Sequence, residues 1–210
     1  MTVGRGSALR YLAAGVVLCW AAIAFAQDFA DGMRAHLDKN YAQSRRIFHA
    51  LADEGNVRAQ FMMGTIYEQG LGVPKDLATA ARWYRQAAEG GNPSAQYNLG
   101  VFYQFGKGVP KDAAEAARWY LKAANQGHGR AQNNLSTFYF TGVGVPRDPV
   151  EAWKWLTLSA EDLKGKGRDI ALENRTVIER EMTPAQVQEA RKRVAGWLSR
   201  HKSGQKKQTK

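Results

Sequence analysis

Apolar side chains recur at helical spacing through the middle of the chain. Ala59, Met63 and Ile66 are separated by three or four residues, which places them on one face of a predicted helix. Gly70 is expected to end this helix, because glycine readily adopts the left-handed conformation that a helix end requires. Asp76 follows a short loop and is expected to cap a second helix that is rich in alanine. The pattern therefore predicts two helices joined by a loop that contains glycine.

This pattern recurs every 36 residues along the chain. The recurring positions are an alanine, a tyrosine and a tryptophan, namely Ala59, Ala95 and Ala131, then Tyr67, Tyr103 and Tyr139, then Trp83, Trp119 and Trp155. The loop recurs as well, as Gly-x-Gly-Val-Pro followed by a basic residue and aspartate, at 70–76, 106–112 and 142–148. A period of roughly 20–50 residues is typical of a solenoid of stacked units. We expect the three tryptophans to be buried between helices.

Acidic residues mark the start of the second helix in two of the repeats. Asp112 with Glu115, and Asp148 with Glu151, have the spacing of a capping box. In a capping box each of the two side chains accepts a hydrogen bond from the backbone N–H of the other residue. Pro149 stands at a first helical position, where its missing N–H costs nothing.

The repeated residues resemble those of the Sel-one-like repeat (SLR) family, a longer-looped relative of the tetratricopeptide repeat (TPR). The resemblance rests on Ala-Gln at each repeat start, a Leu-Gly or Met-Gly pair, the tyrosine, the glycine loop and Ala-x-x-Trp. It implies an all-α fold, a right-handed α-solenoid of stacked helix pairs. The repeats span about 57–92, 93–128 and 129–163, after a TPR-like helical pair at 27–56.

The third repeat departs from this pattern and is expected to contact a different kind of neighbour. Ser136 replaces the glycine of the first helix, and Trp153 replaces a small alanine. A terminal repeat is expected to be atypical, because its outer face does not meet another repeat. We expect C-terminal capping helices at 164–199, the second of them starting with a capping box at 183–186, and a disordered basic tail at 200–210.

The TPR resemblance implies that the first helix of each pair lines a concave groove that binds a protein or peptide. With Gly64 as the fixed glycine of the repeat, the implied groove positions are Arg58, Phe61, Thr65 and Glu68, then Tyr97, Val101, Gln104 and Phe105, then Arg130, Asn133, Thr137 and Phe140. These positions differ between repeats, whereas the framework barely changes. Partner recognition is one interpretation, and simple exposure to solvent is the other.

The first 26 residues have the layout of a secretory signal. Arg5 and Arg10 precede an apolar stretch, which ends at Ala24 and Ala26 with the spacing of a cleavage site. We expect cleavage after Ala26 and a periplasmic or secreted protein. The alternative is an uncleaved anchor in the inner membrane. Cys19 lies within the segment, so cleavage leaves no cysteine and no disulfide.

The net charge of +11 is concentrated near the C-terminus. Residues 27–163 are nearly neutral, whereas 164–210 carry most of the excess of lysine and arginine. A nucleic-acid-binding domain would carry its charge on the fold itself, so we expect no nucleic-acid partner. The basic tail is expected to aid solubility, with weak contact to an anionic membrane surface as the alternative. We expect a monomer.

No catalytic, metal-binding or cofactor-binding pattern emerges from the chain. Gly-x-Ser-x-Gly is absent, and two Ser-x-x-Lys matches at 199–202 and 203–206 lack their partner motifs. The four histidines show no ligand spacing, and His128 occupies the turn position of Asn56 and Asn92. We therefore expect a non-catalytic adaptor without a cofactor. The alternative is a penicillin-binding or β-lactamase-like enzyme, as in a cysteine-rich branch of the family, but the mature chain would lack those cysteines.

Overall fold

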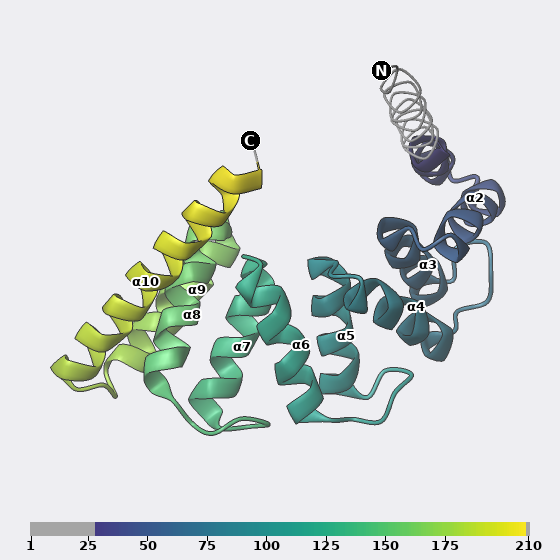
Figure 1. Cartoon of the computed structure of the whole chain (residues 1–210). Helices are drawn as coiled ribbons and strands as arrows, with labels where there is room; N and C mark the ends of the chain where they lie inside the picture. Colours follow the sequence, from purple (N-terminus) through teal and green to yellow (C-terminus); the bar gives the residue numbers. More distant parts are fainter. Residues whose placement is uncertain (1–27, 209–210) are drawn as a thin grey trace, which may run out of the picture. The chain divides into compact units, whose positions relative to one another are not determined.

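The computed structural model describes residues 28–208 and the side chains of residues 28–201. The expected signal segment at 1–26 lies outside the described residues. Every regular element in the described part is an α-helix, which confirms the expected all-α fold class (Figure 1). None of the described helices is long and apolar enough to cross a membrane.

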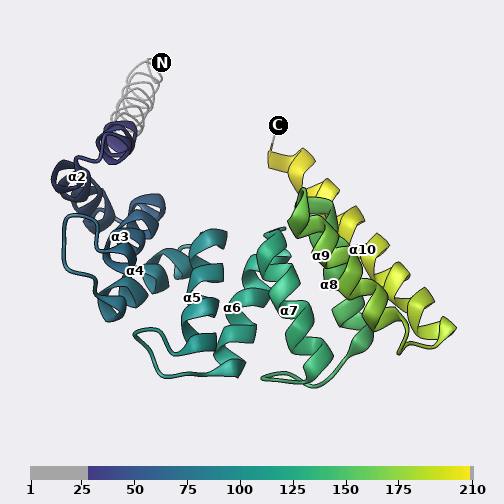
Figure 2. The ribbon, with the colours of Figure 1, turned by 180° about the vertical axis from the view of Figure 1, so that it is seen from behind.

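The chain forms two compact units that divide between Trp83 and Tyr84. After a helix at 28–37, the helices are α2 (Tyr41–Asp53), α3 (Val57–Gln69), α4 (Leu77–Glu89), α5 (Pro93–Phe105), α6 (Ala113–Asn125), α7 (Gly129–Thr141), α8 (Pro149–Asp162), α9 (Lys166–Glu179) and α10 (Pro184–Gln208). In the N-terminal unit α2 packs against α3. In the C-terminal unit each helix from α5 to α8 packs against the next, and both α9 and α10 pack against α8 (Figure 2).

The core of the N-terminal unit comes from one face each of α2 and α3. Phe48 and Leu51 of α2 are buried together with Met63 and Ile66 of α3. The Phe29 ring of the helix at 28–37 lies 5.4 Å from the Phe48 ring. The three- and four-residue spacing therefore selects the buried face of α3, as the sequence predicts.

A polar side chain caps the start of the first helix in each repeat. The side chains of Asn56, Asn92 and His128 accept hydrogen bonds from the backbone N–H groups of Ala59, Ala95 and Ala131 at 3.0, 2.9 and 3.2 Å. In His128 the acceptor is Nδ1, so the imidazole must be neutral at that nitrogen to cap the helix. The histidine has the capping role that its place in the repeat indicates.

The two glycines of each loop have different functions. Gly106 and Gly142 end α5 and α7 with φ of 70° and 74°, as expected for helix ends. The second glycine permits close contact between successive repeats. A methyl group added to Gly72 would lie 2.8 Å from Cβ of Tyr41, and one added to Gly144 would collide with the backbone of Ala113.

Only half of each predicted capping box forms. The Asp112 carboxylate accepts a hydrogen bond from the N–H of Glu115 at 3.0 Å. The prediction of the reciprocal hydrogen bond is wrong, because the N–H of Asp112 donates to the Tyr103 carbonyl at 2.9 Å instead. Asp148 repeats this arrangement with the Tyr139 carbonyl at 2.8 Å. The loop folds back onto the preceding helix end, which frees the Glu115 carboxylate for an ion pair within α6.

The glutamine of each Ala-Gln pair connects one helix pair to the next. Its amide donates to a carbonyl near the end of the preceding helix, from Gln60 to Ala52 at 3.3 Å, from Gln96 to Ala88 at 3.0 Å and from Gln132 to Ala124 at 3.1 Å. Each of these carbonyls also accepts the backbone N–H of the glycine in the following turn, Gly55, Gly91 or Gly127, so the amide is a second donor at a buried junction.

The repeated tryptophans are not equally buried. Trp119 and Trp155 are almost fully buried, as expected. Trp83 is only half-buried, so the prediction is wrong for this residue. Its ring packs at the edge of the core of the N-terminal unit and lies 5.8 Å from the imidazole of His49, an exposed residue of α2.

Trp153 explains why the third repeat departs from the pattern. Its indole N–H donates to the Glu179 carboxylate of α9 at 3.0 Å, and the Arg175 guanidinium lies 5.3 Å from its ring centroid. The equivalent residue of the preceding repeat is the small Ala117. The larger ring fills the space between α8 and α9, which is a cap and not another repeat.

The second capping helix starts as predicted and ends later. Thr183 and Gln186 form both bonds of the capping box, at 2.8 and 3.3 Å. Arg193 of α10 pairs with Asp148 and Glu151 at the start of α8. Disorder was expected from residue 200, but α10 continues to Gln208. Lysine and glutamine are good helix formers, and cations near a helix C-terminus are favourable.

Candidate binding groove

In the N-terminal unit the implied groove positions lie along α3 and contact residues of the same unit. The Arg58 guanidinium lies 4.2 Å from the centroid of the Phe29 ring, a cation–π contact. Phe61, Thr65 and Glu68 are half-buried, and the Thr65 hydroxyl donates to the Phe61 carbonyl at 3.2 Å. None of these four residues lines the large cavity that the structure describes in this unit.

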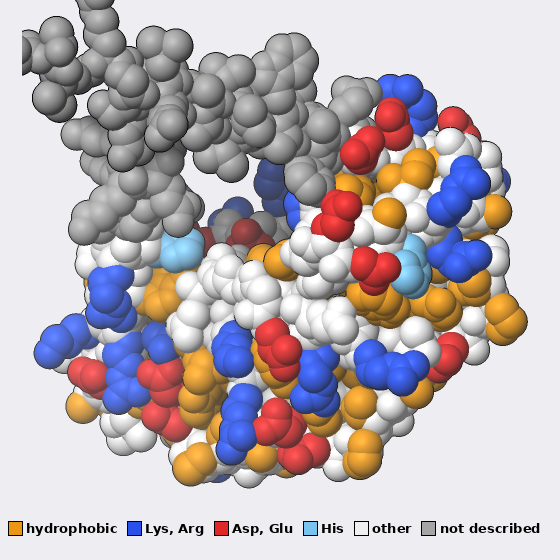
Figure 3. Space-filling model, turned by 45° about the vertical axis from the view of Figure 1, so that its right-hand side comes forward, with side chains coloured by type: hydrophobic (Ala, Val, Ile, Leu, Met, Phe, Trp, Pro, Cys, Tyr) orange, Lys and Arg blue, Asp and Glu red, His pale blue; other side chains and the backbone are white. Residues whose placement is uncertain are grey.

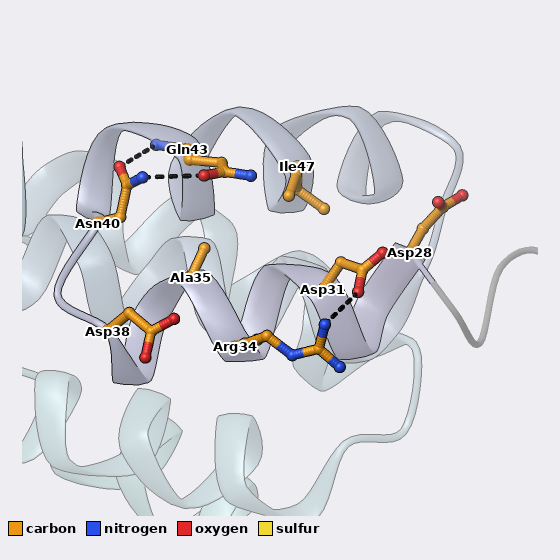
Figure 4. Close-up of a pocket in the computed structure, with 8 residues that line it drawn as sticks. All are labelled: Asp28, Asp31, Arg34, Ala35, Asp38, Asn40, Gln43 and Ile47. Carbon is orange, nitrogen blue, oxygen red and sulfur yellow. Dashed lines mark hydrogen bonds and ion pairs between the residues drawn. The ribbon is translucent and has the colours of Figure 1, made fainter.

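That cavity lies between the helix at 28–37 and α2 (Figure 4). Its volume is about 450 Å³, and its walls are mainly polar, with Asp28, Asp31 and Asp38 among them. Arg34 pairs with Asp31 at 3.6 Å, and the pair is largely exposed. A shallow acidic cavity of this kind offers no catalytic arrangement.

In the C-terminal unit Tyr97 of α5 is part of a stack of aromatic rings. Its ring lies 4.8 Å from the His128 ring in a stacked geometry and 5.9 Å from the Tyr120 ring. Such contacts fix the phenol in place beside the start of α7. Tyr97 is consequently half-buried rather than freely exposed.

The remaining implied positions of α5 are divided between packing and exposure. Gln104 accepts a hydrogen bond from the Tyr120 hydroxyl at 2.6 Å. Val101 is half-buried. Phe105 is 63% exposed at the end of α5, where a large apolar side chain has no packing function in the unit.

The four implied positions of α7 all line cavities. Arg130 and Asn133 lie on its first two turns, and Thr137 and Phe140 lie further along. Arg130 and Thr137 are exposed, whereas Asn133 and Phe140 are half-buried. The Arg147 side chain packs against the Phe140 ring and donates to the Phe140 carbonyl at 3.0 Å.

Two cavities follow one another between α7 and α9. The first, of about 320 Å³, is lined by Tyr97, Arg130, Asn133, Asn134, Leu163, Lys164, Gly167 and Ile170. The second, of about 180 Å³, is lined by Ser136, Thr137, Phe140, Leu156, Asn174, Val177 and Ile178. Residue numbers increase in the same direction along both walls, so the two cavities form successive parts of one groove. We call it the α7–α9 groove.

The sequence interpretation missed the α9 wall of this groove. It assigned residues 164–199 to a cap alone, yet Lys164, Ile170 and Val177 face the implied positions of α7. Ile170 and Val177 are 41% and 51% exposed although both are large and apolar. Their seven-residue spacing, two turns of a helix, is the signal that could have identified the wall.

Burial determines the ionisation of the groups that flank the groove. Burial lowers the pKa of His128, and the nearby Asp162 carboxylate opposes this shift only in part. Burial also raises the pKa of the Tyr120 phenol well above its ordinary value. Both groups are therefore neutral at pH 7. The Asp162 carboxylate accepts a hydrogen bond from the N–H of Gly129 at 3.0 Å and so is engaged at the start of α7.

No cluster of three or more histidine, cysteine or acidic side chains suited to a metal occurs among the described residues. On the face seen in Figure 3, lysine and arginine side chains are interspersed with acidic ones and form no single patch of one sign. The α7–α9 groove, with cations at one end and apolar residues at the other, is the candidate site that the implied positions of α7 line.

The comparisons with known proteins agree with this architecture. The model of the Sel1 repeat matches residues 57–92, 93–128 and 129–162. The chain belongs to the Sel1 repeat family. Members of this family typically mediate protein–protein interaction, and the scaffold is generally non-catalytic.

Solved Sel1 structures show the same fold. A Sel1 repeat protein from Oxalobacter formigenes is 34% identical with a TM-score of 0.63, over 66% of this chain and 57% of that one. A protective antigen of uropathogenic Escherichia coli strains, which displays an SLR fold, is 29% identical with a TM-score of 0.55, over 76% and 41%. The chain thus spans about half the length of these Sel1 relatives. No curated protein matches it.

Proposed function

We propose that the protein is a non-catalytic adaptor that binds a segment of a protein partner in the α7–α9 groove. The observation that supports this most directly is the row of two cavities between α7 and α9, lined by all four implied positions of α7. Aromatic and arginine side chains of this kind supply much of the binding energy at protein interfaces. The Sel1 repeat family has this general function.

We also propose that the protein binds its partner outside the cytoplasm. The residues at 1–26 have the three parts of a secretory signal, and the remaining chain has no cysteine to be oxidised. The likeness to a protective antigen of uropathogenic strains is compatible with an exported protein. The protein acts there as a monomer, and its basic C-terminal residues make at most a weak contact with an anionic membrane surface.

Site-directed photo-crosslinking tests the groove. A benzophenone side chain introduced at Val177 should crosslink to a partner in an extract of the source cell envelope, and peptide mapping should identify the crosslinked segment. The same group at Arg118, an exposed residue of α6 outside the groove, is the matched control. Equal crosslinking from both positions, or crosslinking from Arg118 alone, would show that the groove is not the binding site.

The enzymatic alternative has a separate test. Purified protein should leave the chromogenic β-lactam nitrocefin intact, because the described residues hold no arranged nucleophile and base. Hydrolysis that survives repurification and is lost on substitution of groove residues would replace the adaptor proposal with the β-lactamase-like one.

A further inference from the structure

The first cavity of the α7–α9 groove has an excess of positive charge. Arg130 reaches it from α7, and Lys164 reaches it from the segment before α9. No carboxylate lines this cavity, and no ion pair among the described side chains includes either cation. Two unpaired cations on opposite walls favour an anionic group placed between them.

The same cavity also has a hydrogen-bond acceptor without a partner. The side-chain oxygen of Asn133 is buried in the cavity wall and accepts no hydrogen bond within the described part of the chain. An unsatisfied buried oxygen is unfavourable, and a small rotation of the amide would present it to a donor in the cavity. A backbone N–H of a bound peptide is such a donor. An extended peptide offers such donors along its whole length, whereas a helix leaves free only the N–H groups of its first turn.

The second cavity selects a different side chain. Its walls are Phe140, Leu156 and Ile178, together with the exposed Val177 and the uncharged Thr137. No lysine, arginine or carboxylate lines it. A volume of about 180 Å³ accommodates one large aliphatic or aromatic side chain. Burial of that side chain against these walls would contribute to affinity through the hydrophobic effect.

The distance between the cavities fixes the spacing of the two groups. Arg130 and Thr137 are seven residues apart on α7, and so are Ile170 and Val177 on α9. Seven residues of helix rise by about 10 Å, and an extended chain covers the same distance in about three residues. A helical ligand would need about seven residues to span it.

We infer that the α7–α9 groove recognises an extended protein segment in which an aspartate or glutamate side chain lies three residues from a large apolar residue. The carboxylate lies between Arg130 and Lys164 in the first cavity, and the apolar side chain fills the second cavity beside Thr137 and Val177. The segment is internal, so the carboxylate belongs to a side chain and not to the end of the partner chain. This inference rests on the proposed function and specifies the chemistry of the partner.

Selection from a phage-displayed library of short random peptides tests the inference without a known partner. Selected sequences should be enriched in an acidic residue three positions from leucine, isoleucine or phenylalanine, in one chain direction. Enrichment at a spacing of seven would indicate a helical ligand and overturn the extended geometry. No enrichment of acidic residues, or no selection at all, would overturn the inference itself.

Synthetic peptides then measure how much the acidic side chain contributes to the affinity. A Glu-x-x-Leu peptide with acetylated and amidated ends should bind at least about tenfold more tightly than its Gln-x-x-Leu counterpart, measured by fluorescence anisotropy. Equal binding would exclude the carboxylate contact. Binding that requires a free C-terminus would assign the site to a terminal carboxylate instead, and binding only of a phosphorylated peptide would assign it to phosphate.

Charge reversal in the groove gives the matched protein test. The double variant Arg130→Glu/Lys164→Glu should lose the Glu-x-x-Leu peptide and prefer a Lys-x-x-Leu peptide. Lys166→Glu/Arg168→Glu makes the same charge change on exposed residues of α9 that line neither cavity, and it should leave the original preference intact. An unchanged preference in the groove variant, with its helical circular dichroism retained, would refute the inference.

The crosslinking experiment separates the two proposals. If Val177 crosslinks to a protein segment but the Glu and Gln peptides bind equally, the adaptor function holds and the acidic preference is wrong. If the groove neither crosslinks nor selects any peptide, both proposals are wrong.

Discussion

The second glycine of each loop is a residue whose importance comes from a neighbouring repeat. Gly144 adopts φ of 75° and lies directly against the backbone of Ala113, at the start of α6. Gly91, in the turn after α4, has a similar φ of 89° but open space around its Cα. The two positions therefore separate the cost of backbone conformation from the cost of close contact.

Gly144→Ala should destabilise the protein considerably more than Gly91→Ala. Alanine at positive φ costs about 1–2 kcal/mol at either site, and overpacking against a backbone adds about 1–3 kcal/mol at Gly144. Urea unfolding followed by circular dichroism gives both free energies. Equal losses would mean that the loop moves away from α6 at no cost.

His128 makes the stability of the C-terminal unit depend on pH. Its pKa is lowered in the folded state, so the unfolded chain binds a proton more readily than the folded one. This group therefore contributes its full stabilisation above the ordinary histidine pKa of about 6.5, and the contribution is lost as the pH falls below that value. Protonation would also remove the Nδ1 acceptor that caps α7.

His128→Asn should remove this part of the pH dependence and keep the cap. Asparagine already fills the equivalent position in the two preceding repeats, at Asn56 and Asn92. The unfolding midpoint in urea should fall between pH 7.5 and pH 5.5 for the parent protein and fall less for the variant. Parallel profiles for the two proteins would show that other groups control the response to acid.

At the scale of helices, one large side chain of α8 makes a specific contact with α9. Trp153 is buried, and its indole N–H is bonded to Glu179 on the facing helix. Where another repeat follows instead of a cap, alanine occupies the same position. The groove depends on this contact, because α9 forms one of its walls.

Trp153→Ala should loosen α9 selectively. Truncation of a large buried aromatic side chain costs about 3–5 kcal/mol. Hydrogen exchange measured by mass spectrometry should show that residues 166–179 lose protection while α5 and α6 keep theirs. Val177→Ala, on the exposed face of α9, is the control and should change protection little. Protection of 166–179 that remains at the parental value would show that α9 is held by other contacts.

The positions of the helices follow from residues that are close in sequence, whereas the contacts between helices do not. Spacing, glycine and aspartate predict where α3 ends and where α6 begins, because helix formation and capping involve residues close in sequence. The bond from the Asp112 N–H to the Tyr103 carbonyl, and the packing of Gly72 on Tyr41, join segments that meet only in the folded chain. The α9 wall of the groove is of this second kind, which is why the sequence predicts its α7 wall alone.

At the scale of the whole molecule, cleavage or retention of residues 1–26 determines in which compartment the repeats are located. Ala24 and Ala26 place small side chains at the positions that signal peptidase requires. The protein recovered from the cell envelope should begin at Gln27, and intact mass or N-terminal sequencing will show it. A protein that retains Met1 would instead be anchored by its apolar segment.

The location of the groove at the last repeat affects how such a chain can change over time. The hydrogen bonds from the Gln96 side-chain amide to the Ala88 carbonyl and from the Gln132 side-chain amide to the Ala124 carbonyl are equivalent. The junctions on either side of residues 93–128 are therefore interchangeable. Duplication of residues 93–128 would preserve the junction chemistry, keep both walls of the groove and keep a tyrosine at the position of Tyr97 in the first cavity. The array can therefore lengthen in evolution, or by design, without altering ligand specificity, which is encoded by α7, by its immediate neighbours and by a helix outside the repeats.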